Sequence, residues 1–159
     1  MGLLKASKIT IYQNEEIDRL EKNLRKISNG DFNIDLDVLE GDSSVINERE
    51  RFIRLNQYIL KIKESFSSIA KDTENLSANM KEGNLDYRIN TSRYNGQYSR
   101  IGKDMNESID AISQPINDAK LALDKIELND YTAKIENNYK GSLSQFINEI
   151  ISVRARLLS

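Results

Sequence analysis

The 159-residue chain contains no cysteine, no histidine and no tryptophan, and it has a single proline. It therefore lacks thiolate and imidazole ligands for metals, thiol nucleophiles, imidazole bases and a phosphoacceptor histidine. Without cysteine it cannot form a disulfide, which suits a reducing compartment. Aromatic residues make up only 7% of the chain. This scarcity and the single proline favour an elongated helical protein over a β-sandwich or barrel.

Net charge and long apolar runs are also scarce. The formal net charge is −2, from 23 basic and 25 acidic residues, and no basic stripe typical of a nucleic-acid-binding protein is present. No run approaches the ~18 apolar residues of a membrane span, and the first residues are too few for a signal peptide. We therefore expect a soluble protein, or the soluble part of a longer one, in the cytoplasm and without nucleic acid as a partner.

The chain also lacks the motifs that carry catalysis. We find no glycine-rich phosphate loop, no cluster of metal ligands and no pair of nucleophile and base. The sequence therefore predicts that this chain is not an enzyme, that it holds no cofactor or metal, and that it binds no small-molecule ligand.

Apolar residues recur at steps of three and four in four stretches, a spacing that places their side chains on one face of a helix. The four stretches are 17–27, 52–80, 98–126 and 143–157. The first helix is expected to begin near Asn14 as its N-cap. The second stretch is a sustained heptad pattern. The third changes step beside Pro115, where a kink is expected because proline removes a helical hydrogen bond.

The segments between these helices repeat one pattern three times: a turn-forming residue is followed by large apolar residues two and six positions later. The turn residues are Gly30, Gly83 and Asn129, which suit the left-handed conformation that ends a helix. The apolar positions are Phe32, Leu36, Leu85, Ile89, Tyr131 and Ile135. Apolar and polar residues alternate here as in a strand, but no partner strand is evident, so we expect extended connectors laid against helices.

This succession of helix, turn, connector and second helix resembles the HAMP domain. Ile101-Gly102, at the start of a second helix, and Pro115-Ile116, fourteen residues before Asn129, also look like that family. The stretch from Gly30 to Leu36 and the Tyr-x-Gly motif ahead of a second helix resemble the tandem HAMP arrays of methyl-accepting chemotaxis proteins. The family usually has an acidic residue before the first core position of the second helix, and this sequence has Arg51, Arg100 and Gln145 there.

The resemblance implies an all-α fold of three consecutive HAMP-like units, at 1–63, 64–113 and 114–159. Each unit would be a parallel four-helix bundle with two helices from each chain of a parallel homodimer, and helices would be continuous between units. Two helices alone cannot bury the apolar rows, which supports a dimer independently. The implied function is to relay a conformational signal from a covalently linked sensor to a kinase-control domain of a chemotaxis receptor, which would contact a kinase and its adaptor.

The middle unit departs from the other two. Thirteen, ten, six and three residues before the turn, the first and third units carry mostly isoleucine and leucine. The middle unit carries Ala70, Thr73, Ser77 and Met80 at these positions. Its larger residues Ile69 and Leu76 lie one position earlier, so it fits two helix rotations. Our hypothesis is that this unit is a bistable element of the relay. The alternative is that its small polar residues are simply tolerated.

Two other functions compete with this interpretation. A passive coiled-coil spacer or dimerisation scaffold would have one uninterrupted heptad pattern, which the connectors and the change of step argue against. The chain could also be the relay segment of a histidine kinase or a cyclase. Three tyrosines near the second helices, Tyr94, Tyr98 and Tyr139, are expected to pack with their hydroxyls at the surface.

Overall fold

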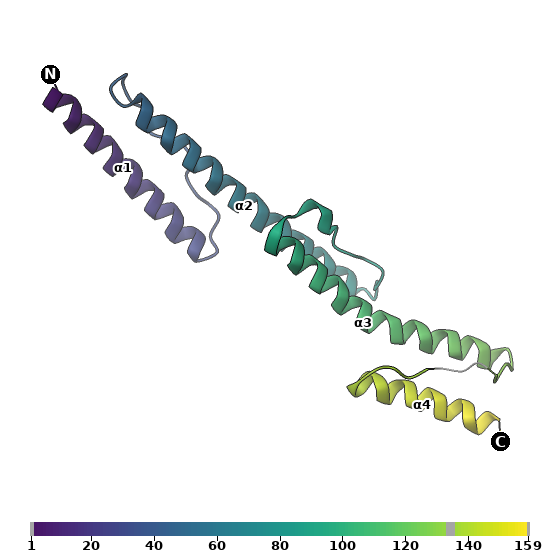
Figure 1. The fold of residues 1–159 in the computed structure, drawn as a ribbon. Coiled ribbons are helices and arrows are strands. Elements are labelled where there is room, and N and C mark those ends of the chain that lie inside the picture. Colours follow the sequence, from purple (N-terminus) through teal and green to yellow (C-terminus); the bar gives the residue numbers. More distant parts are fainter. Residues whose placement is uncertain (1, 133–135, 159) are drawn as a thin grey trace. The chain divides into compact units, whose positions relative to one another are not determined.

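The computed structural model describes residues 2–132 and 136–158. These residues form four α-helices and one short 3-10 helix, and they contain no strand. The helices are α1 (Gly2–Ser28), α2 (Ile46–Lys81), α3 (Gly96–Glu127) and α4 (Gly141–Leu157), as Figure 1 shows. The 3-10 helix η1 (Thr91–Arg93) precedes α3. The predicted all-α class is confirmed.

Three segments join the α-helices, and we call them connector 1 (29–45), connector 2 (82–95) and connector 3 (128–140). The chain divides into two compact units, Met1–Ala70 and Lys71–Ser159, with the boundary inside α2. The division into three units at 1–63, 64–113 and 114–159 stays a prediction.

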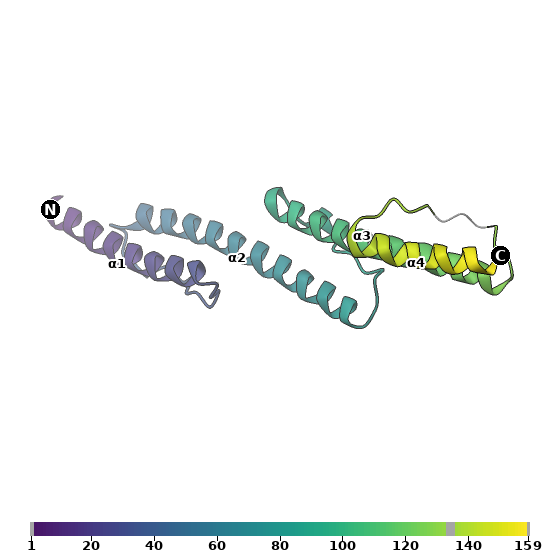
Figure 2. The same cartoon turned by 90° about the horizontal axis from the view of Figure 1, so that it is seen from below.

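In the first compact unit, α1 and the beginning of α2 run in the same direction, and connector 1 returns beside them (Figures 1 and 2). Its apolar core joins Tyr12, Val45 and Phe52. The Tyr12 and Phe52 rings meet edge to face with centroids 6.2 Å apart. The expected start of this helix at Asn14 is wrong, because α1 begins at Gly2. The additional turns bring Tyr12 into the core.

The second compact unit holds the end of α2 together with α3 and α4. Its apolar core joins Ala119, Ala122, Ile147 and Ile150, between α3 and α4. The two helices run in the same direction, as both views show. Pro115 is buried within α3, which continues through it as one helix. A bend at this proline stays a prediction.

Candidate functional site

Each connector begins with the same kind of turn. Gly30, Gly83 and Asn129 have φ angles of 76°, 79° and 56°. In all three turns, the N–H of the following residue donates at 2.9 Å to the carbonyl five residues before it. This hydrogen bond closes a helix on a left-handed residue. A Cβ added at Gly30 or Gly83 would meet no atom within 4 Å, so backbone conformation rather than space selects glycine there.

The apolar connector residues are covered to different degrees. Ile89 is 3% exposed, whereas Phe32, Leu36, Leu85 and Tyr131 are half-buried. Phe32 stacks on Phe66 of α2 with ring centroids 4.9 Å apart. Ile135 lies outside the described residues. That these positions fix the connectors stays a prediction.

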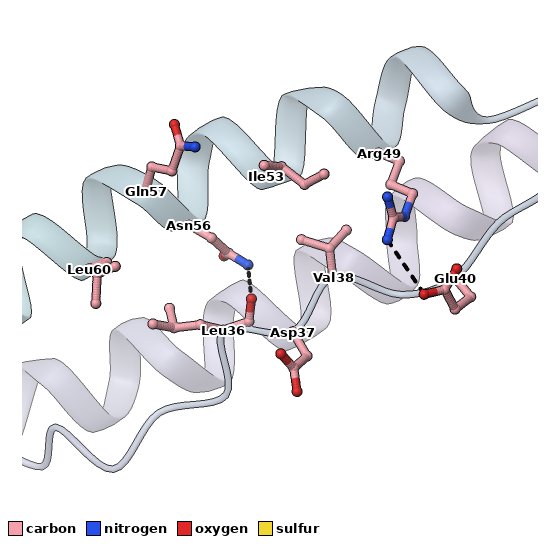
Figure 3. A pocket seen from close by; sticks show the side chains of 9 residues that line it. All are labelled: Leu36, Asp37, Val38, Glu40, Arg49, Ile53, Asn56, Gln57 and Leu60. Carbon is pink, nitrogen blue, oxygen red and sulfur yellow. Dashed lines mark hydrogen bonds and ion pairs between the residues drawn. The ribbon is translucent and has the colours of Figure 1, made fainter.

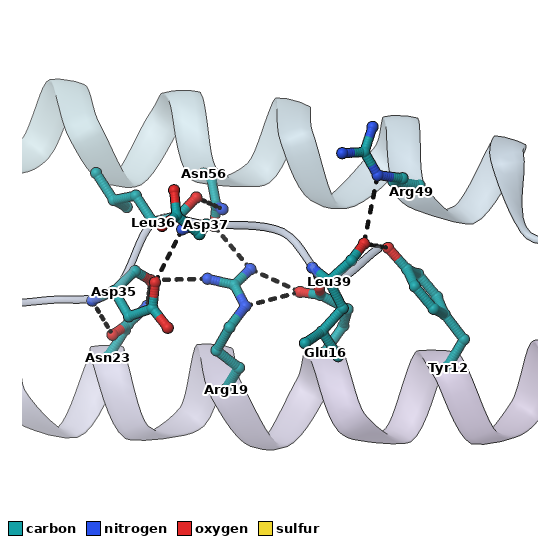
Figure 4. A network of polar contacts seen from close by, with 10 residues as sticks. All are labelled: Tyr12, Glu16, Arg19, Asn23, Asp35, Leu36, Asp37, Leu39, Arg49 and Asn56. Carbon is teal, nitrogen blue, oxygen red and sulfur yellow. Dashed lines mark hydrogen bonds and ion pairs between the residues drawn. The ribbon is translucent and has the colours of Figure 1, made fainter. Parts of the chain in front are cut away.

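Buried polar side chains of α1 hold connector 1 (Figure 4). The Glu16 carboxylate is fully buried and accepts hydrogen bonds from the Leu39 N–H at 2.5 Å and from the Arg19 guanidinium at 2.6 and 2.9 Å. Arg19 also donates to the Asp35 carbonyl at 2.7 Å and to the Asn56 side chain at 3.2 Å. These additional bonds matter because a buried ion pair is favourable only when its remaining polar atoms are satisfied.

Two asparagines complete this network from opposite helices. The Asn23 amide of α1 binds both polar groups of one connector residue, accepting from the Asp35 N–H at 3.0 Å and donating to the Asp35 carbonyl at 2.5 Å. The Asn56 amide of α2 donates to the Leu36 carbonyl at 2.6 Å. The connector backbone is therefore held by side chains, as a strand would be held by its neighbour.

The end of connector 1 is attached to the beginning of α1. The Tyr12 hydroxyl donates to the Leu39 carbonyl at 2.9 Å, and burial raises the pKa of Tyr12 above its ordinary value. Lys8 pairs with Asp42 at 2.8 Å. The hydrogen bond from Lys8 lowers the pKa of Asp42. Both contacts involve the part of α1 that precedes the predicted helix start.

Connector 2 is held from the other side, by its second helix. The Asn106 side chain of α3 accepts from the Ile89 N–H and donates to the Ile89 carbonyl, both at 2.9 Å. The Arg88 guanidinium extends from the connector to the Asp110 carboxylate of α3 at 2.5 and 3.0 Å. The residue six positions after the turn is thus fixed by α3.

Each Tyr-x-Gly tyrosine binds an aspartate of the preceding helix. Tyr94 donates to Asp72 at 2.6 Å and Tyr139 donates to Asp118 at 2.5 Å. Burial and the bond to Asp72 raise the pKa of Tyr94 to about 12. The bond to Asp118, with burial, raises the pKa of Tyr139 to about 12. The expectation of a surface hydroxyl is wrong for Tyr94, which is 8% exposed, because a buried hydroxyl requires a partner and Asp72 supplies it.

The candidate switch residues of α2 lie in two rows. Ile69 and Leu76 are each 6% exposed. Among the others, Ala70, Thr73 and Met80 are half-buried and Ser77 is exposed. The Thr73 hydroxyl lies 3.5 Å from the Met105 sulfur. The larger residues therefore occupy the more buried row, and a second helix rotation stays a prediction.

A different set of apolar residues remains uncovered on all four helices, and we call it the exposed row. Its members are 38–53% exposed and are separated by four or seven residues along each helix, which is the spacing of one face. The row comprises Ile17, Leu24, Leu55, Ile62, Ile112, Ile116, Leu123, Phe146, Val153 and Leu157. Only part of each predicted apolar face is thus buried within one chain.

A groove of about 580 Å³ lies between connector 1 and α2 (Figure 3). Leu36 and Val38 line it from the connector, and Ile53 and Leu60 line it from the helix. The groove leaves Leu36 and Val38 half-buried beside α2. In the part of the chain that the structure describes, no group of three or more acidic side chains could hold a metal ion, and no helix has the length and apolarity of a membrane span.

The sequence patterns did not reveal the polar residues that hold the connectors. Glu16 and Asn23 are seven residues apart with Arg19 between them, so the three share one helix face. A second signal is an aspartate eleven residues before the turn in two of the three repeats, at Asp72 and Asp118. Both signals are visible in the sequence once the repeats are aligned on their turn residues.

Comparison with known proteins identifies one part of the chain. Residues 93–155 match the HAMP domain family. This segment runs from the end of connector 2 through α3 and connector 3 into α4. No curated protein matches the chain. HAMP domains are non-catalytic modules that relay signals in sensor and transducer proteins, where they generally act as homodimers. Residues 93–155 of this chain form a HAMP domain.

Proposed function

We propose that the chain is a relay of three tandem HAMP units in a chemotaxis receptor. It transmits a helix rotation or tilt from a linked sensor to a kinase-control domain on the cytoplasmic side. The observation that carries this proposal is the HAMP domain at 93–155 together with turns of the same geometry at Gly30, Gly83 and Asn129. The repeated turns support extension of the HAMP pattern to the rest of the chain.

The exposed row supports a parallel homodimer. A soluble protein rarely leaves a row of large apolar side chains in water on one face of each helix. The row is present on every helix, so the same faces of a second copy can cover it about a two-fold axis. Two helices from each chain then complete a four-helix bundle.

The middle unit supplies the movable part of the relay. Ile17 and Leu24 in the first unit and Ile116 and Leu123 in the third lie thirteen and six residues before the turn, and all four belong to the exposed row. The middle unit has the small residues Ala70 and Ser77 at these positions. It therefore offers less apolar area to a second copy, and a weakly packed element can exchange between two arrangements of similar energy.

Thr73→Ile tests this assignment. The added apolar surface favours one packing of the middle unit, so we expect a higher melting temperature of the dimer and receptor kinase activity held in one state. Ala78→Ile is the matched control, because Ala78 is exposed on the same helix and its substitution should change neither quantity. A stabilised dimer with unchanged kinase control would contradict the assignment.

A relay ahead of a histidine kinase or a cyclase would share this physical basis. The connectors favour any relay over a passive spacer, because each one breaks the continuous heptad that a spacer needs. The identity of the linked output domain separates the three outputs. A kinase or cyclase domain would replace the chemoreceptor assignment and leave the relay intact.

A further inference from the structure

The backbone of connector 1 is attached mainly to its first helix. Asn23 binds both the N–H and the carbonyl of Asp35, and Glu16 accepts the Leu39 N–H. Tyr12 donates to the Leu39 carbonyl. These bonds fix two connector residues, four positions apart, to α1. A segment held to one helix at two points is expected to move with that helix.

The backbone of connector 2 is attached to its second helix instead. The two-point amide bond that Asn23 makes in connector 1 is made here by Asn106 of α3, to Ile89. A second bond comes from the Ser99 hydroxyl of α3 to the Thr91 carbonyl at 3.3 Å. These two bonds also lie at separate points of the connector.

The side chains of α2 explain why connector 2 cannot be attached as connector 1 is. Fourteen and seven residues before the turn, α1 carries Glu16 and Asn23, whereas α2 carries Ile69 and Leu76. Isoleucine and leucine have no side-chain donor or acceptor for a backbone group. Asp72 of α2 reaches connector 2 through the side chain of Tyr94 at the far end.

Connector 1 also has two bonds from its second helix to its backbone, from Asn56 to the Leu36 carbonyl at 2.6 Å and from Arg49 to the Leu39 carbonyl at 3.3 Å. The Asn56 amide also accepts a hydrogen bond from Arg19 of α1. Beside it lies the groove of about 580 Å³ between connector 1 and α2. The connector backbone thus has two side-chain hydrogen bonds to α2 and six to α1.

The described end of connector 3, 136–140, also contacts its second helix. Its Asn137 side chain donates to the Ser144 carbonyl at 3.0 Å and to the Asn148 side chain at 2.8 Å, both in α4. The residue that aligns with Asn23 is Ala122, which cannot form the amide pair.

We propose that connector 1 moves with its first helix and that connector 2 moves with its second helix, with Asn23 and Asn106 as the positioning residues. A displacement between α1 and α2 is then taken up where connector 1 meets α2, at the groove. A displacement between α2 and α3 is taken up where connector 2 meets α2. The inference that displacements are taken up at these places rests on the proposed relay. The attachment of each connector to one helix does not.

Pairs of nitroxide labels test the attachment, and the absence of cysteine in the sequence lets each label be placed without removing a native thiol. For connector 1, a label at the exposed Asn33 is paired with one at Asp18 of α1 or at Arg54 of α2. Labelled chains are diluted with unlabelled chains, so that only distances within one chain are measured by dipolar electron paramagnetic resonance. We expect the distribution of distances to α1 to be at least twofold narrower than that to α2.

For connector 2, a label at Asp86 is paired with one at Glu74 of α2 or Lys103 of α3, all of them exposed. For connector 2, we expect the distribution of distances between Asp86 and Lys103 of α3 to be narrower than that between Asp86 and Glu74 of α2. Equal widths to both helices in either connector, or the same preferred helix in both, would overturn the proposal.

Two alanine variants test whether Asn23 and Asn106 cause the difference in the widths of the distance distributions. Asn23→Ala should at least double the width of the distribution between Asn33 and Asp18 and leave that between Asp86 and Lys103 unchanged. Asn106→Ala should do the reverse, and unchanged widths in both variants would overturn the role of these residues. All measurements use the chain without an output domain. A failed pattern therefore leaves the relay standing. A correct pattern with no effect of Thr73→Ile on kinase control would remove only the assignment of the middle unit as the movable part of the relay.

Discussion

At the scale of single residues, the connectors depend on hydrogen bonds made by buried polar side chains. Tyr94 illustrates this dependence, because its ring lies at the end of connector 2 and its hydroxyl reaches across to Asp72. The carboxylate also has Arg93 at 3.5 Å. Removing the hydroxyl therefore leaves Asp72 with a longer ionic contact but without its short hydrogen bond.

Stability at alkaline pH should report on Tyr94. Its pKa of about 12 in the folded chain exceeds the ordinary value of 10, so folding favours the neutral hydroxyl. The stability that this provides is complete below pH 10 and is lost as the pH rises from 10 towards 12. We expect Tyr94→Phe to unfold more easily at neutral pH by about 1 kcal/mol and to lose less stability between pH 9 and 11 than the parent chain.

Urea unfolding at several pH values measures both effects. Tyr139 has a similarly raised pKa, so Tyr94→Phe should reduce the alkaline loss and the double variant with Tyr139→Phe should reduce it further. Tyr58→Phe is the control, because Tyr58 is 62% exposed. The interpretation fails if Tyr94→Phe retains the full alkaline loss of the parent chain.

At the scale of elements, the helices were predictable because their apolar residues repeat every three or four positions. The left-handed turns followed from the residue types at Gly30, Gly83 and Asn129. The beginning of α1 was not predictable, because its first turns pack through Tyr12 against Val45 and Phe52, which are distant in sequence. Hydrophobic periodicity contains no information on such contacts.

The polar network of α1 was missed for a related reason. Ile17 and Leu24 define an apolar row, and the row one residue earlier, with Glu16 and Asn23, appears in a sequence as solvated surface. In the structure the assignments are reversed. The carboxylate of Glu16 is fully buried, and Ile17 is 52% exposed. The polar row could have been identified only from the requirement that the N–H and carbonyl groups of the connector backbone have hydrogen-bond partners.

Glu16→Gln should destabilise the chain far more than a surface substitution. The change removes the buried negative charge opposite Arg19, whose side chain is 10% exposed. Breaking a buried pair leaves an uncompensated charge and costs about 3 kcal/mol or more. Glu21→Gln is matched to it, because Glu21 pairs with Arg25 of the same helix at the surface, where such a pair contributes about 0.5 kcal/mol.

Urea unfolding of both variants measures this difference. Hydrogen exchange should also show faster exchange of the Leu39 amide in Glu16→Gln, because that amide donates to Glu16. Equal losses of stability in the two variants would show that the Glu16 carboxylate is not needed to hold connector 1.

At the scale of the whole molecule, one chain buries only part of its apolar surface. Leu24 is 53% exposed and Leu123 is 50% exposed, and each lies six residues before the turn residue that ends its helix. In α1 the polar residues Glu16 and Asn23 contact connector 1, whereas the apolar Ile17 and Leu24 stay exposed. The proposed dimer would use the exposed residues, so connector attachment and self-association would depend on different residues of the same helix.

Self-association should therefore depend on the exposed row and not on apolar exposure in general. Leu123 and Leu121 lie two residues apart on α3, and both are at least half exposed, but only Leu123 belongs to the row. Burying a leucine side chain contributes about 2 kcal/mol. In a two-fold symmetric dimer both chains carry the substitution, so its effect on the dimer counts twice. We expect Leu123→Asn to weaken dimerisation at least tenfold, equivalent to about 1.4 kcal/mol, and Leu121→Asn to leave it unchanged. Sedimentation equilibrium over a range of concentrations measures both. A parent chain that is monomeric would rule out a dimer formed through the exposed row. Equal dissociation constants for the two variants would also rule it out, because only Leu123 belongs to the row.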